Sequence, residues 1–139
     1  MTIEETQKYA EELVASVSRD KRVFALVGDL GVGKTTFSRF FLRALGVTEP
    51  VTSPTFVIMK NYSVVHPYFT RACHVDCYRL KNPEEMTALG FAQILTDEKT
   101  IVLIEWADRI AEALPQSTVW IDFAHIDEVN RHIVPRTEK

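Results

Sequence analysis

Apolar residues recur at helical spacing in two stretches of the N-terminal part of the chain. Thr2 and Glu5 fit a capping box, which predicts a packing helix that ends before the polar turn at 18–21. The apolar face of this helix consists of Ala10, Leu13, Val14 and Val17. A second helix is predicted before Gly46, which ends it. Its apolar positions are Phe37, Phe40, Phe41, Ala44 and Leu45.

Other apolar runs have the length and composition of strands. The runs at 22–27 and 101–105 are almost wholly apolar, which is typical of parallel strands buried on both faces. The runs at 56–65 and 71–80 are joined by a short connection, so we expect antiparallel neighbours, because a parallel pair needs a long crossover. The runs at 118–123 and 129–134 predict a closing hairpin. Further short helices are predicted from Asn82 to Gly90, at 91–95 and at 108–114.

This succession of elements predicts an α/β fold with a mixed parallel and antiparallel sheet flanked by helices. Within the 71–80 run, the strand period of two separates an apolar set from a polar one. We therefore expect one face of this strand to be core and the other to carry polar groups or chemistry. The first set is Cys73, Val75 and Cys77, and the second is His74, Asp76 and Tyr78.

Composition narrows the class of protein. The chain has 139 residues, 46% of them hydrophobic and 25% charged, which predicts a single ordinary globular domain over 1–139. No apolar run approaches the ~20 residues of a membrane span, and the N-terminus has no signal pattern, so we expect a cytoplasmic protein without membrane contact. The net charge of −3 argues against a chain that binds RNA by itself, so any RNA would be held by a partner.

The two cysteines predict neither a disulfide nor a metal site. On an extended strand Cys73 and Cys77 would lie ~13 Å apart, which is beyond disulfide reach. A metal pair would need two further ligands, and the sequence offers no Cys/His cluster. We expect reduced, packed thiols.

The chemistry is concentrated in the stretch from Gly28 to Thr35, which matches the phosphate-binding loop pattern G-x-x-x-x-G-K-[ST] (Walker A) at every fixed position. Glycines allow the backbone to turn successive amides toward phosphate oxygens, and the following helix directs its positive end to the same place. Lys34 would reach the β/γ-phosphates and the Thr35 hydroxyl would bind Mg²⁺. A chance match in a glycine turn is the alternative, but the strand before and the helix after are the context that a true loop requires.

Further candidate residues follow the loop. Ser53, Pro54 and Thr55 lie in a hydroxyl-rich segment that either closes over the γ-phosphate as a switch or is a plain connector. Glu105 ends a buried strand, where it either delivers a carboxylate to the phosphate site or simply meets solvent. Trp106 follows Glu105. Its indole either is exposed and stacks on a base or binds a partner, or is buried and covers the sheet edge.

Together these motifs make the chain resemble the bacterial TsaE (YjeE) family. The residues that carry the resemblance are the phosphate loop, Ser53-Pro54-Thr55-Phe56, the H-x-D-x-Y-R-L run at 74–80 and Ile104-Glu105-Trp106. They occur in the family's order over nearly the whole chain. The chain departs from the family at Val32, where Ala is usual, and at Ala107, where Pro is common, but neither change removes a proposed ligand.

The resemblance assigns roles to individual residues. It implies that Lys34, Asp76 and Glu105 are catalytic and that Thr35 and Glu105 hold the metal, leaving open whether Asp76 or Glu105 orients the attacking water. It implies a switch-like loop at 53–55. Nucleotide-binding residues are implied at Thr6, Gly28, Asp29, Leu30, Gly31, Val32, Gly33, Lys34, Thr35, Thr36 and Arg131.

The resemblance also implies a function. It points to a P-loop ATPase that binds ATP or ADP with Mg²⁺, turns over slowly until partners stimulate it, and is required for threonylcarbamoyladenosine formation next to the tRNA anticodon. The implied partners are the threonylcarbamoyl-transferase subunits TsaD and TsaB, with tRNA reached only through them. Two rivals remain: a binding module in which nucleotide occupancy suffices, and a small-molecule kinase, although the chain offers no separate Arg-bearing lid. A GTPase is less favoured because no N-K-x-D segment is present.

Overall fold

The computed structural model describes residues 2–28, 34–49, 59–77, 84, 90–125 and 131–135. Within them the sheet has six strands in the order β2-β3-β4-β1-β5-β6. The inner strands β3, β4, β1 and β5 run parallel, whereas β2 and β6 pair antiparallel with their neighbours at the two edges. The elements are α1 (Ile3–Ser16), β1 (Val23–Val27), α2 (Lys34–Ala44), β2 (Met59–Ser63), β3 (Arg71–Asp76), α4 (Phe91–Thr96), β4 (Thr100–Glu105), η1 (Ala107–Ala113), β5 (Val119–His125) and β6 (Arg131–Pro135).

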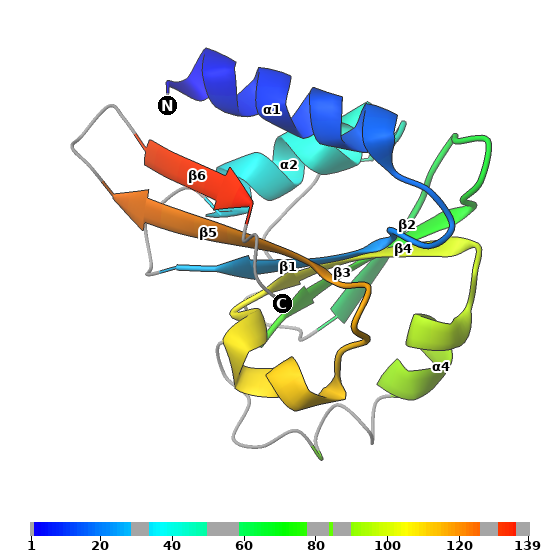
Figure 1. The fold of residues 1–139 in the computed structure, drawn as a ribbon. Helices are drawn as coiled ribbons and strands as arrows, with labels where there is room; N and C mark the ends of the chain where they lie inside the picture. Colours follow the sequence, from blue (N-terminus) through cyan, green and yellow to red (C-terminus); the bar gives the residue numbers. More distant parts are fainter. Residues whose placement is uncertain are drawn as a thin grey trace.

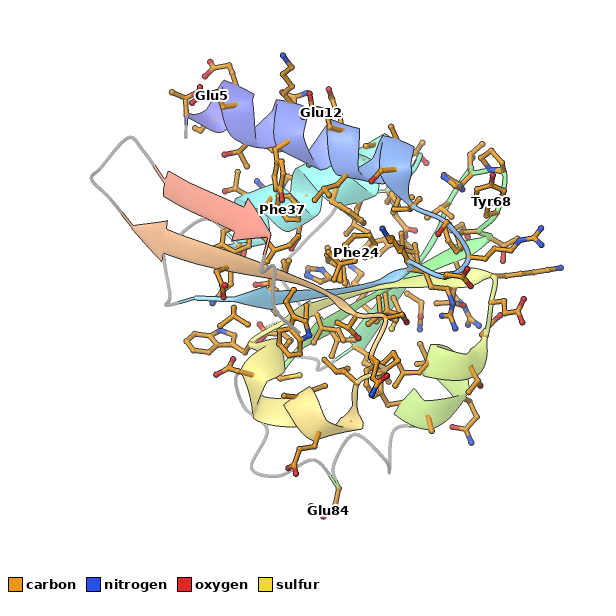
Figure 2. All side chains as sticks on the ribbon, in the orientation of Figure 1. Glu5, Glu12, Phe24, Phe37, Tyr68 and Glu84 are labelled. Atoms are coloured by element: carbon orange, nitrogen blue, oxygen red, sulfur yellow. The ribbon has the colours of Figure 1, made fainter. Side chains whose placement is uncertain are left out.

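Helices cover both faces of the sheet (Figure 1). α1 and α2 lie on one face, and α4 and the 3₁₀ helix η1 lie on the other. The first layer contains a core in which Phe24 of β1 and Phe37 of α2 project into the space between strand and helix (Figure 2). The second layer is built on the opposite side chains of the same strands, such as Val23, Val75 and Ile104. The predicted α/β fold with a mixed, helix-flanked sheet is therefore confirmed.

The N-terminal helix begins where the capping box predicts. The Glu5 amide donates to the Thr2 hydroxyl at 3.2 Å, and the Thr2 amide donates to the Glu5 carboxylate at 2.7 Å. These two reciprocal bonds satisfy backbone donors that have no partner inside the helix. Ala10 and Val14 are buried against α2, as their spacing predicts.

The strand predictions are confirmed in their pairing and in the two faces of β3. β2 and β3 are antiparallel neighbours, β4 is a buried parallel strand, and β5 and β6 form the closing hairpin. The expectation for the two faces of β3 is confirmed, because Cys73 and Val75 lie in a core cluster while His74 and Asp76 are polar residues on the opposite face. That polar face is buried as well. The polar face of this strand lies under α2 rather than in solvent. The segments 56–58, 78–80 and most of the predicted helix after Asn82 lie outside the described residues.

Both cysteines are buried thiols packed in the core, as predicted. Burial raises the pKa of the Cys73 thiol to about 11. In the part of the chain that the structure describes, no helix is long and apolar enough to cross a membrane.

Two glycines at positive φ allow a stability prediction. Gly46 (φ 93°) ends the α2 segment, and a Cβ there would lie 3.0 Å from the Val65 backbone nitrogen. For Gly90 (φ 77°), the contact among the described residues is with the end of the Gln93 side chain, at 3.4 Å. The left-handed conformation alone costs an alanine about 1 kcal/mol. We expect Gly90→Ala to lose about that much in urea unfolding and Gly46→Ala clearly more, because backbone atoms cannot move aside easily. Equal losses would contradict the steric argument.

The raised pKa of Cys73 predicts low thiol reactivity. At pH 8 a thiol with a pKa of about 11 is ionised in only about one molecule in a thousand, and the thiolate is the reactive form. In a Cys77→Ala background, alkylation of native protein should be far slower than that of urea-unfolded protein. Native and unfolded rates within a factor of two of each other would show that Cys73 is accessible and normally ionised.

Candidate functional site

The predicted site residues gather where the inner strands end. β1 ends at Val27 and is followed by Gly28, β3 ends at Asp76, and β4 ends at Glu105. Asp76 of β3 and Leu26 of β1 are the register partners of Glu105 on either side of β4. Parallel strands deliver their carboxyl ends to one edge of the sheet, which is where open α/β sheets bind ligands.

Lys34, the first residue of α2, is buried at this edge with only 4% of its surface exposed. Its Nζ donates a hydrogen bond to the Gly28 carbonyl and lies 3.8 Å from the centroid of the Trp106 ring. An ammonium group removed from water needs such partners, and both a carbonyl dipole and an aromatic face stabilise it. The lysine therefore sits between the end of β1 and the start of α2, beside the stretch that the motif identifies as a phosphate cradle.

Glu105 is held by two side chains from different elements. Its Oε2 lies 2.7 Å from His74 Nε2 of β3 and accepts a 3.3 Å contact from the Ser38 hydroxyl of α2. All three side chains are buried, at 4% exposure or less. A buried carboxylate without donors would be strongly disfavoured, so this pairing is what permits an acid at the end of a core strand. The alternative that Glu105 simply meets solvent is wrong.

Asp76 places a second carboxylate beside the first. It is 8% exposed and in register with Glu105 on the neighbouring strand, and such strands lie about 4.8 Å apart. Among the described residues, no group of three or more His, Cys, Asp or Glu side chains could hold a metal ion alone. Two carboxylates on adjacent strands, with Thr35 following Lys34 in α2, nevertheless fit Mg²⁺, which usually keeps waters and shares its coordination with substrate phosphates.

Trp106 has a strained backbone at the same edge. It is the only non-glycine residue at positive φ in the described part of the chain, with φ 57° and ψ 39°. This conformation costs a bulky residue about 1–2 kcal/mol. Its indole is partly buried against the core on the η1 side of the sheet, and the Lys34 ammonium lies over its ring.

The other predicted binding residues belong to α1, α2 and β6 or lie outside the described residues. Thr6 is buried in α1, and its hydroxyl donates to the Thr2 carbonyl at 2.9 Å, within its own helix. Arg131 begins β6, where its backbone pairs with His125. Thr35 and Thr36 follow Lys34 in the first turn of α2 and are half-buried. Asp29, Leu30, Gly31, Val32, Gly33, Ser53, Pro54 and Thr55 lie outside the described residues.

His74 and Ser38 contact Glu105 in the site, but the sequence did not assign either of them a role. A signal existed for each. His74 precedes Asp76 by two residues and therefore shares its face of β3, and Ser38 follows Lys34 by one helical turn and therefore shares its face of α2. The sequence did not show that these two faces meet at Glu105.

Comparison with known proteins identifies the family. The family model described as threonylcarbamoyl adenosine biosynthesis protein TsaE matches residues 1–133. The tRNA threonylcarbamoyladenosine biosynthesis protein TsaE of Bacillus subtilis is 38% identical over 131 residues, which are 94% of this chain and 78% of that protein. Its counterpart in Rickettsia bellii is 36% identical over 129 residues, 92% of this chain and 85% of that protein.

The fold is also similar to a solved structure. The crystal structure of Bacillus subtilis YdiB superposes with a TM-score of 0.76 at 31% identity, covering 97% of this chain and 80% of that one. The resemblance based on scattered motifs is thus matched by similarity over almost the whole length. The chain belongs to the TsaE family of threonylcarbamoyladenosine biosynthesis proteins.

Proposed function

We propose that this protein binds ATP with Mg²⁺ and is a slow ATPase that the threonylcarbamoyl-transferase subunits TsaD and TsaB stimulate, so that its turnover serves their modification of tRNA. The observation that most supports the proposal is the convergence of Lys34, Asp76 and Glu105 at one edge of the sheet, next to the phosphate-loop sequence. A buried ammonium beside two buried carboxylates is suited to charge neutralisation in phosphoryl transfer. With a net charge of −3, the chain would reach tRNA through its partners.

In this mechanism the residues of the chain position the metal and the attacking water and neutralise the charge of the phosphates. Lys34 would leave the Gly28 carbonyl and bind the β/γ-phosphate oxygens, which are better partners for an ammonium than a neutral carbonyl. Glu105 and Thr35 would hold the metal, and Asp76 or Glu105 would orient the attacking water. Mg²⁺, when bound, would neutralise charge on the phosphate oxygens.

Two alternatives differ in the fate of the γ-phosphate. In an occupancy module, ATP binding alone sets the affinity for a partner and hydrolysis is not required. In a small-molecule kinase, the phosphate goes to an acceptor instead of water. The decisive measurement is phosphate release from γ-labelled ATP, for the protein alone and with purified TsaD and TsaB. We expect free phosphate and marked stimulation; a phosphorylated metabolite would favour the kinase, and tight binding without stimulation the module.

Replacing Lys34 tests the nucleotide site directly. Lys34→Ala should weaken ATP binding at least about tenfold, because a charge-assisted hydrogen bond to phosphate is lost. Arg39→Ala is the matched control, since it removes a positive charge from the exposed face of the same helix. Binding is measured by isothermal titration calorimetry. If both variants bind ATP as the parent does, the proposed site is wrong.

A variant of Asp76 distinguishes a requirement for ATP hydrolysis from a requirement for ATP binding alone. Asp76→Asn keeps the shape of the side chain but removes a carboxylate that could orient water, so we expect hydrolysis to fall by about 10²-fold or more while ATP still binds. The same variant should fail to support threonylcarbamoyladenosine formation in a reconstituted reaction. Full modification by a variant that no longer hydrolyses ATP would favour the occupancy module.

A further inference from the structure

His74 is a buried polar residue that the proposed function leaves without a role. Its side chain is 1% exposed, and its Nε2 lies 2.7 Å from Glu105 Oε2. When Glu105 is ionised, its carboxylate can only accept hydrogen bonds, and the proton of this bond then belongs to Nε2. The other ring nitrogen, Nδ1, is buried and has no hydrogen-bond partner among the described residues.

This arrangement is poorly explained by packing alone. The neighbouring buried positions of β3, Ala72, Cys73 and Val75, carry no nitrogen or oxygen atom in their side chains. An imidazole at His74 instead brings a buried acceptor that remains unpaired in the described part of the chain. Leaving such a group unpaired opposes folding, so the histidine contributes something other than stability.

The geometry of Ser38 shows that Glu105 depends chiefly on His74. The Ser38 hydroxyl lies 2.8 Å from the Lys34 carbonyl and 3.3 Å from Glu105 Oε2. It has one hydrogen, so it cannot donate to both acceptors at once, and the shorter contact is with its own helix. The 2.7 Å bond from His74 is therefore the firmer restraint on the carboxylate.

Both described contacts also end on the same oxygen. His74 and Ser38 approach Oε2 of Glu105, and neither contact involves Oε1. A carboxylate fixed through one oxygen keeps its second oxygen for another ligand and cannot rotate freely. Groups that hold a metal-binding carboxylate in this way affect metal affinity without touching the metal.

We propose that His74 is a positioning residue that holds Glu105 through Oε2 and thereby directs Oε1 to the Mg²⁺ of a bound Mg·ATP. The inference rests on the proposed function, because it assigns Glu105 to the metal. It adds a specific consequence: the contribution of His74 is to Mg²⁺ affinity, whereas binding of metal-free ATP, which depends on the phosphate loop and Lys34, does not need it.

The test is the Mg²⁺ dependence of nucleotide binding in three variants. His74→Leu removes the donor and His74→Gln keeps an N–H near the Nε2 position. Val75→Ala is the control, a buried truncation of the adjacent residue on the opposite face. We expect His74→Leu to raise the Mg²⁺ concentration for half-maximal tight ATP binding about tenfold or more, His74→Gln to recover most of this, and Val75→Ala to resemble the parent. An unchanged Mg²⁺ dependence in His74→Leu would overturn the proposal.

A second measurement uses the protein without any ligand and does not require that His74→Leu folds. Nitrogen-15 spectra of the histidine rings in the parent protein should show the Nε2 proton on His74, with its resonance shifted in Glu105→Gln. An Nδ1–H tautomer would overturn the proposal even if His74→Leu fails to fold.

If the parent itself binds no ATP, the proposed function fails. If the parent binds Mg·ATP normally and His74→Leu does too, only the role of His74 fails.

Discussion

The site depends on the parallel pairing of β4 with both β1 and β3. This pairing places the ends of the three strands at one edge, with Asp76 and Leu26 in register with Glu105 on its two sides. A parallel sheet of this kind is buried on both faces, and here α1 and α2 cover one face while α4 and η1 cover the other (Figure 1). A change of β4 register by one residue would turn the Glu105 side chain away from α2, and the site residues would no longer lie together at this edge of the sheet.

Burial at this edge makes every charged group dependent on a specific partner. Lys34 is stabilised by the Gly28 carbonyl and the Trp106 ring, and Glu105 by His74. Such groups can be removed from water only where donors and acceptors are already placed, so the surrounding core is a precondition for the chemistry. The same low exposure would strengthen the electrostatic effect of each group on the phosphate of the proposed nucleotide.

The link between the lysine and the indole joins two motifs that are far apart in the sequence. Trp106 has a left-handed backbone immediately after β4, and this turn brings its ring over the Lys34 ammonium. Strained conformations of bulky residues persist only where the surroundings fix them, and they are concentrated at functional sites. The strain therefore agrees with the position of Trp106 beside the proposed nucleotide site and not in an ordinary loop.

The sequence by itself determined the elements and much of the site's composition. The capping box of α1, the helix before Gly46, the buried strand ending in Glu105 and the antiparallel β2–β3 pair follow from local spacing and turn chemistry. These are properties of neighbouring residues, so a linear pattern reveals them.

Only the tertiary structure decided which of these elements meet. Strand order brought β4 between β1 and β3, buried both faces of β3, and joined His74 and Ser38 to one oxygen of Glu105. These contacts link residues 31 and 67 positions apart, and they depend on sheet order and register. Neither property is encoded in any single stretch of the chain, because each arises when separate apolar faces pack into one core.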